Sequence, residues 1–140
     1  MISLPINQLL LRNPEIINDQ LLVVNPPQDQ GLLQLIKPHN SQLINFDARI
    51  HQACEKLGLR TEFGLPSEHS FESALLYWPK SKSFSSSLFR WLASQIKQPT
   101  KVFVLAANDA GGKSLNNSLK PFGEEITKLD VARKCSLWSF

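Results

Sequence analysis

The sequence predicts an α/β fold of the Rossmann-like kind, in which a mostly parallel sheet is covered by helices on both faces. Short apolar runs that end at turn residues alternate with segments whose apolar residues recur at helical spacing. The lengths of these segments suit strands joined by crossover helices. Of the 140 residues, 42% are hydrophobic and 19% are charged, which is typical of one compact domain and excludes a disordered or fibrous chain.

The first half of the chain is predicted to hold three strands and two helices. The first strand, an unbroken apolar run, ends at the turn formed by Asn25, Pro26 and Pro27. Asp47 is placed to cap the second helix, and Gly58 to end it. The expected boundaries are a strand at 21–24, a helix at 29–36, a strand at 43–46, a helix at 47–58, a strand at 59–63 and a loop at 64–70.

The second half continues the alternation. Residues 74–78 form a strand candidate that ends at Pro79, and a helix capped by Ser83 or Ser85 leads to Pro99. The clearest strand follows at 101–106. The remaining expectations are a glycine-led helix through Leu115 and Leu119 and a final strand within 132–140. We see no internal repeat or linker, so residues 1–140 are expected to form a single domain.

Composition and spacing exclude several classes of function. Residues 1–11 lack the basic region and cleavage pattern of a signal peptide, and no apolar run is long enough to cross a bilayer. A cytoplasmic protein without a membrane partner is therefore expected. Cys54 and Cys135 match neither a disulfide framework nor a metal-binding spacing, so we expect two buried thiols and no metal site. The spacing of the serine, cysteine and histidine residues matches no known catalytic arrangement.

A glycine-rich turn offers one candidate binding site. The stretch Ala107–Ser114 lies between a strand and a predicted helix and satisfies a loose phosphate-loop pattern, with alanine in place of the first glycine. Lys113 and the amides of Gly111 and Gly112 are suited to hold an anion. No apolar strand that ends in a magnesium-binding aspartate follows this turn. The nearest aspartate downstream, Asp130, comes after residues 126–129, which read Ile-Thr-Lys-Leu and are not a convincing apolar strand. A nucleotide-binding protein that uses Lys113 remains the alternative hypothesis.

Charge and aromatic content allow contact with nucleic acid without requiring it. The formal net charge is +3, and lysine and arginine gain affinity by neutralising phosphates. The candidates for phosphate contacts are Lys80, Lys82, Lys113, Arg133 and Lys134. Several aromatic residues near them are suited to stack on bases, although core packing is the simpler role for Phe89 and Trp91.

Three segments resemble the N-terminal domain of a known enzyme family. They are Leu9–Asn13 (LLLRN), Leu75–Lys82 (LLYWPKSK), and the pair Val102–Ser114 (VFVLAANDAGGKS) and Lys128–Trp138 (KLDVARKCSLW). On these segments the chain resembles the ribosomal RNA small subunit methyltransferase C family, which methylates guanine N2 in 16S rRNA. The resemblance departs at residues 106–109, where the family tends to read Gly-Glu-Asn-Arg and this chain reads Ala-Ala-Asn-Asp, so the arginine of the family has no counterpart here.

The resemblance implies a degenerate class I methyltransferase fold. Family members hold two methyltransferase-like domains in tandem, of which the C-terminal one keeps the S-adenosylmethionine site and the Asn-Pro-Pro-aromatic motif. A chain that stops at Phe140 therefore implies a non-catalytic N-terminal domain, and the catalytic C-terminal domain is absent from it. The implied partners are that C-terminal domain and 16S ribosomal RNA or the small ribosomal subunit, in the setting of ribosome biogenesis.

The residues themselves agree that no cofactor or catalytic site is present. Class I methyltransferases bind S-adenosylmethionine on a glycine-rich turn after the first strand, and here that turn holds Pro26 and Pro27. Asn25-Pro26-Pro27 resembles the base-holding motif, but it follows the first strand rather than the fourth and continues with Gln28. After the fourth strand the chain reads Tyr77-Trp78-Pro79-Lys80, without the amide or carboxylate that such a motif needs. Cofactor binding through a non-standard pocket is the third hypothesis.

Overall fold

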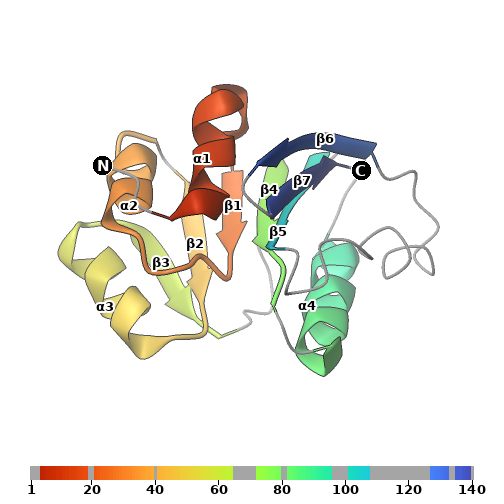
Figure 1. The fold of residues 1–140 in the computed structure, drawn as a ribbon. Helices are drawn as coiled ribbons and strands as arrows, with labels where there is room; N and C mark the ends of the chain where they lie inside the picture. Colours follow the sequence, from red (N-terminus) through yellow and green to blue (C-terminus); the bar gives the residue numbers. More distant parts are fainter. Residues whose placement is uncertain are drawn as a thin grey trace.

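The computed structural model describes residues 4–18, 21–39, 41–64, 72–79, 82–95, 101–107, 127–132 and 135–139. Figure 1 shows the helices and strands that they form. In chain order these are α1 (Pro5–Arg12), the short 3-10 helix η1 (Pro14–Ile16), β1 (Leu21–Val24), α2 (Gln30–Ile36), β2 (Gln42–Asn45), α3 (Ala48–Lys56), β3 (Arg60–Phe63), β4 (Ser73–Tyr77), α4 (Lys82–Gln95), β5 (Lys101–Ala107), β6 (Thr127–Ala132) and β7 (Cys135–Ser139).

The strands form one seven-stranded sheet in the order β3-β2-β1-β4-β5-β7-β6. The five strands from β3 to β5 are parallel to their neighbours, whereas β7 runs antiparallel between β5 and β6. The predicted mostly parallel α/β sheet is therefore confirmed. Its strand order reverses between β1 and β4, and the carboxyl ends of these two strands therefore mark the switch point at which open α/β sheets bind ligands.

Helices cover both faces of the sheet, as predicted (Figure 1). On one face α1, α2 and α3 contribute buried residues, among them Leu9, Leu32 and Cys54, to a core that also contains Val23 of β1. On the other face, α4 packs its buried leucines onto the sheet; the core there includes Val24, Leu76, Leu88, Leu92 and Val104. Because β1 is buried on both faces, its four consecutive apolar residues have the pattern expected of a central parallel strand.

Two aspartates begin the helices that follow β1 and β2. The side chain of Asp29 accepts a hydrogen bond from the amide of Gly31, and that of Asp47 accepts one from the amide of Arg49. Each carboxylate satisfies an amide that has no partner within its helix. Gly58 lies just beyond α3 with a φ of 75°, a left-handed conformation that glycine adopts without strain. The sequence predicted Asp47 and Gly58 as the limits of this helix.

Three elements were absent from the sequence prediction: α1, the short helix η1 and β6. Helix α1 begins at a proline in the first helical turn and buries Leu9 and Leu10. Strand β6 forms the sheet edge and exposes its apolar residues Leu129 and Val131, and an irregularity between Lys128 and Asp130 breaks its alternation. The predicted final strand begins later than expected, at Cys135, and β6 precedes it.

Contacts with α1 and β7 fix β6 in place. The guanidinium of Arg12 lies 2.8 Å from a carboxylate oxygen of Asp130, and the Asn13 amide donates to the other oxygen at 3.1 Å. On the opposite face of the strand, the ammonium of Lys128 lies 5.0 Å from the ring centre of Trp138. The N-terminal helix is thus tied to an edge strand more than a hundred residues later in the chain.

Other predictions concern isolated residues. Cys54 and Cys135 are both buried free thiols, as expected. Within the residues that the structure describes, no helix has the length and apolar character needed to cross a membrane. The same residues include no group of three or more histidine, cysteine or acidic side chains placed to hold a metal ion.

Candidate functional site

The candidate site lies at the carboxyl ends of β1 and β4. Asn25 follows β1 in the left-handed conformation, with a φ of 60°, which asparagine tolerates better than most residues. Its backbone amide donates to the carbonyl of Ile44 in β2 at 2.9 Å, and its side-chain amide donates to the carbonyl of Tyr77 in β4 at 3.0 Å. Asn25 therefore joins the ends of three strands, and the predicted Asn-Pro-Pro turn has a structural role at this position.

Three buried polar side chains are linked by hydrogen bonds at this switch point, on the face covered by α1, α2 and α3. The hydroxyl of Tyr77 donates to Oδ1 of Asn7 at 2.5 Å, and Nδ2 of Asn7 donates to Oδ2 of Asp29 at 2.9 Å. The exposed fractions of Tyr77, Asn7 and Asp29 are 4%, 0% and 2%. These three side chains connect the end of β4, the first turns of α1 and the start of α2.

Asp29 directs both carboxylate oxygens at groups of its own chain. Oδ1 accepts from the amide of Gly31 at 3.1 Å, while Oδ2 accepts from the amide of Leu4 at 3.2 Å as well as from Asn7. In cofactor-binding α/β proteins, amides at the start of this helix face a ligand. Here a side chain of the protein takes one of them, and the beginning of α1 lies against the helix start.

The environment of Tyr77 is strongly unfavourable to a phenolate. Burial removes the hydroxyl from water, and this desolvation raises the pKa of Tyr77 well above its ordinary value of 10.0. The negative charge of Asp29 raises the pKa further. The hydroxyl therefore remains a hydrogen-bond donor to Asn7 throughout the physiological pH range.

Aromatic side chains occupy the other face of the same edge. Phe46 follows β2, Trp78 follows β4, and Phe84 lies in the first turn of α4; all three are half-buried and pack against the core beneath α4. The rings of Phe46 and Phe84 meet edge to face, with centres 5.0 Å apart and planes at 84°. The backbone amide of Trp78 donates to the carbonyl of Leu105 at 2.9 Å, which fixes the start of the segment after β4.

The acidic residue at the end of β2 is also used locally. Asp47 accepts from the backbone amide of Arg49 at 2.9 Å, and its second oxygen lies 3.2 Å from the Arg49 guanidinium. The side-chain hydrogen bond from Arg49 is the largest cause that lowers the pKa of Asp47. In dinucleotide-binding folds an acidic residue after the second strand holds a ribose hydroxyl, but here it caps α3 and binds the arginine of its own helix.

A second polar group lies between α3 and the strands β2 and β3. Nδ2 of the buried Asn45 donates to the Thr61 hydroxyl at 2.6 Å and approaches the sulfur of Cys54 at 3.8 Å. Nδ1 of His51 lies 3.2 Å from the same hydroxyl. Desolvation raises the pKa of Cys54, so this thiol is poorly suited to act as a nucleophile. Within the described residues, Oδ1 of Asn45 is buried and without a hydrogen-bond partner.

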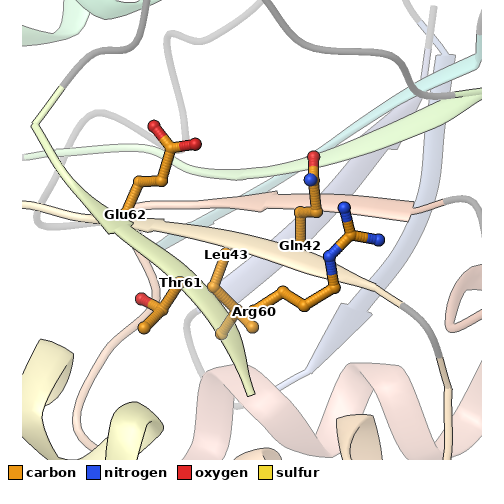
Figure 2. A pocket seen from close by; sticks show the side chains of 5 residues that line it. All are labelled: Gln42, Leu43, Arg60, Thr61 and Glu62. Atoms are coloured by element: carbon orange, nitrogen blue, oxygen red, sulfur yellow. The ribbon is translucent and has the colours of Figure 1, made fainter.

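Figure 2 shows a pocket at the β3 edge of the sheet, away from the switch between β1 and β4. Its volume is about 160 Å³, and it is lined by Gln42, Leu43, Arg60, Thr61 and Glu62. Pockets that enclose small molecules usually measure roughly 300–1,000 Å³. We assign no function to this shallow hollow.

Comparisons with known proteins identify the family. The model of the family described as "Methyltransferase small domain N-terminal" matches residues 7–140. The chain belongs to this family.

Curated relatives of this chain agree with the family match. Ribosomal RNA small subunit methyltransferase C of Shewanella pealeana is 31% identical over 140 residues, which cover 95% of this chain and 41% of that protein. The protein of the same name from Pseudomonas syringae pv. tomato is 32% identical, with 96% and 40% covered. The resemblance seen in the sequence is thereby confirmed, and the chain spans about 40% of the length of these relatives.

Solved methyltransferase structures share the fold of this family member. The T. thermophilus 16S rRNA N2 G1207 methyltransferase, in complex with AdoMet and guanosine, superposes with a TM-score of 0.68 at 10% identity, covering 86% of this chain and 34% of that one. A putative methyltransferase from Pseudomonas syringae gives a TM-score of 0.71 at 7% identity, covering 96% and 95%. The predicted Rossmann-like methyltransferase fold is confirmed.

The predicted phosphate contacts of this family member fall largely outside the described residues. Lys80, Lys113, Arg133 and Lys134 lie outside them, and Lys82 begins α4 without a described side chain. The segments that carry them nevertheless follow the carboxyl ends of strands; the last strand residues before them are Tyr77, Ala107 and Ala132. The structure thus groups the origins of these segments at one edge of the sheet, and the contacts themselves remain a prediction.

The phosphate-loop-like turn can be located only at its start. Ala107 ends β5, as the sequence required of a strand before such a loop, and residues 108–114 lie outside the described part of the chain. The predicted helix through Leu115 and Leu119 and most of the loop predicted at 64–70 also lie outside it. Sequence reasoning missed Asn7, because the helix that carries it was not predicted.

Proposed function

We propose that this chain is the N-terminal domain of an S-adenosylmethionine-dependent 16S rRNA guanine-N2-methyltransferase. It has no cofactor site of its own, supports the folding of an adjacent catalytic domain and helps that domain to hold ribosomal RNA. The observation that carries the proposal is the buried Tyr77–Asn7–Asp29 chain at the switch between β1 and β4. Acting alone, the 140-residue chain is expected to be inactive, and its place of action is the cytoplasm.

Two features support the absence of a cofactor site. The polar groups at the carboxyl ends of β1 and β4 are paired with one another or with Asn7, so a ligand entering there must first break hydrogen bonds between buried groups. Pro26 and Pro27 cannot provide the close backbone approach that a glycine turn allows. The cofactor is therefore assigned to the part of the full-length protein beyond this chain, for which the greater length of the relatives leaves room.

Two other features support contact with RNA. The related proteins carry names of ribosomal RNA methyltransferases, and the chain has a net charge of +3. The five candidate residues occur in segments that follow β4, β5 and β6, which end at a common edge of the sheet. Cationic side chains gathered along one edge would follow an RNA backbone by neutralising successive phosphates.

The test is the salt dependence of binding to 16S rRNA fragments. We expect affinity to fall as salt rises, and replacing Lys80, Lys82, Lys113, Arg133 and Lys134 together by glutamate to weaken binding and to flatten that dependence. Each phosphate contact that is lost should reduce the slope of log affinity against log salt by about 1.

The control reverses three exposed lysines at the opposite edge of the sheet, compared with five residues in the test variant. Lys37 follows the end of α2, Lys56 ends α3 and Lys101 begins β5. Charge reversal at these positions changes the net charge in the same direction but leaves the proposed RNA edge intact. Equal weakening per reversed charge in the control and in the five-residue variant would show a non-specific charge effect, and no weakening by the five-residue variant would remove the RNA role.

A further inference from the structure

We infer that Phe46, Trp78 and Phe84 form a stacking site for an unpaired RNA base; we call these three residues the aromatic edge cluster. The inference rests on the proposed function, since it names the part of the RNA that this edge of the domain recognises. It adds a base contact to the phosphate contacts already proposed. The cluster consists only of residues that the structure describes.

The position of the cluster is that of a ligand site. Phe46 and Trp78 directly follow the carboxyl ends of β2 and β4, on either side of β1, and Phe84 lies in the first turn of the helix that follows β4. This is the edge at which open α/β sheets bind ligands, next to the point where the strand order reverses. On the other face of this edge the Tyr77–Asn7–Asp29 hydrogen bonds occupy the switch point, and the three aromatic side chains lie on the face that carries α4.

The cluster is less buried than the core on which it packs. The side chains of that core, such as Leu76 and Val104, are fully buried, whereas the three aromatic residues are partly buried and keep some surface exposed. The rings of Phe46 and Phe84 meet edge to face rather than stacking on each other. Aromatic faces at a protein surface bind the faces of unpaired bases, with little dependence on base identity.

The sequence beside the cluster supplies charge for the sugar-phosphate backbone of the same nucleotide strand. Lys80 and Lys82 follow Trp78 within four residues, and Phe84 comes two residues later. A stacked base and a neutralised phosphate are the usual combination in proteins that bind single-stranded RNA. A protein partner has no comparable need for lysines interleaved with aromatic residues, so RNA is the occupant to which the inference commits.

The test compares two tryptophans of the same α4-covered core. Trp78→Leu removes a ring of the cluster, whereas Trp91→Leu removes a half-buried ring that packs on the same core from the third turn of α4. Binding of a short, labelled single-stranded oligoadenylate to the 140-residue chain would be followed by fluorescence anisotropy. We expect Trp78→Leu and Phe84→Leu to weaken binding about tenfold, Trp78→Phe to restore most of the affinity, and Trp91→Leu to leave it unchanged.

A second measurement follows the wild-type chain and does not depend on how well the leucine variants fold. In the wild-type chain the indole N–H signal of Trp78, identified as the one missing from the Trp78→Phe spectrum, should shift as oligoadenylate is added, and that of Trp91 should not. The inference is overturned if the Trp78 signal does not move, or if Trp78→Leu and Trp91→Leu have equal effects. Loss of binding in the lysine-to-glutamate variant alone refutes the stacking site but retains the RNA role; loss in neither set refutes both.

Discussion

Removing a single hydroxyl tests the polar chain at the switch between β1 and β4. Tyr77→Phe deletes the donor that binds Oδ1 of Asn7 at 2.5 Å and otherwise preserves the shape of the ring. Because Asn7 has no exposed surface, its oxygen is left buried without this donor. The free energy of unfolding should therefore fall by about 1–3 kcal/mol, the usual effect of leaving a buried polar group unsatisfied.

A double-mutant cycle separates this bond from other effects of the substitution. Asn7→Ala removes the partner of Tyr77 and one donor to the Asp29 carboxylate, so it should destabilise the protein more than Tyr77→Phe does. The two changes together should cost less than their sum, with a coupling energy of about 0.5–3 kcal/mol. Urea unfolding followed by circular dichroism provides the values. A Tyr77→Phe protein as stable as the wild type, with additive changes in the cycle, would refute the polar chain.

The same residue should make stability depend on pH at the alkaline end. Folding raises the pKa of Tyr77 above its ordinary value of 10.0, so the unfolded chain releases this proton at a lower pH than the folded chain does. Stability is fully present below about pH 10 and falls as the pH rises from there toward the folded pKa, by up to about 1.4 kcal/mol per pH unit. Tyr77 is the only tyrosine, so ultraviolet absorbance reports its ionisation directly, and Tyr77→Phe should lose this component of the pH dependence.

Three further predictions concern other contacts. Asn25→Ala should reduce the free energy of unfolding by about 1–2 kcal/mol more than Asn25→Gly, since only glycine avoids the strain of a left-handed φ; equal losses would contradict that conformation. Asp130→Asn should cost about 0.2–1 kcal/mol, because Arg12 is half-exposed, and the difference should shrink in high salt; a difference that salt leaves unchanged would argue against the ion pair. Cys54 and Cys135 should react with a thiol reagent at least about a thousandfold more slowly than a free thiol, because local opening must come first; rapid labelling of the folded chain would exclude their burial.

Local signals in the sequence were sufficient for most of the sheet. The apolar run at residues 21–24, the prolines that follow it and the aspartate cap of α3 each specify structure through residues within a few positions of one another. The predicted strands and helices that fall on described residues therefore agree with the structure to within about three residues. Helix α1 had the same kinds of signal, a proline in its first turn and apolar residues at 6, 9 and 10, and the prediction overlooked them.

The candidate site was less accessible to sequence reasoning because its contacts are long-range. Tyr77 and Asn7 are 70 residues apart, and no local pattern indicates that their side chains meet. Strand β6 is specified by pairing with β7 and by the contact of Asp130 with α1 rather than by apolar alternation, which its irregularity interrupts. The sequence did show that the turn after β1 lacks glycines, but it did not show which residues lie in the space beside it.

The most direct test of the central claim is a calorimetric titration of S-adenosylmethionine into the 140-residue chain. The proposal is that the carboxyl edge between β1 and β4, where Asn25, Tyr77, Asn7 and Asp29 pair with groups of the protein itself, does not bind the cofactor. We predict no heat of binding beyond dilution, at concentrations where a catalytic methyltransferase domain would saturate. A saturable heat with one cofactor bound per chain would contradict the account.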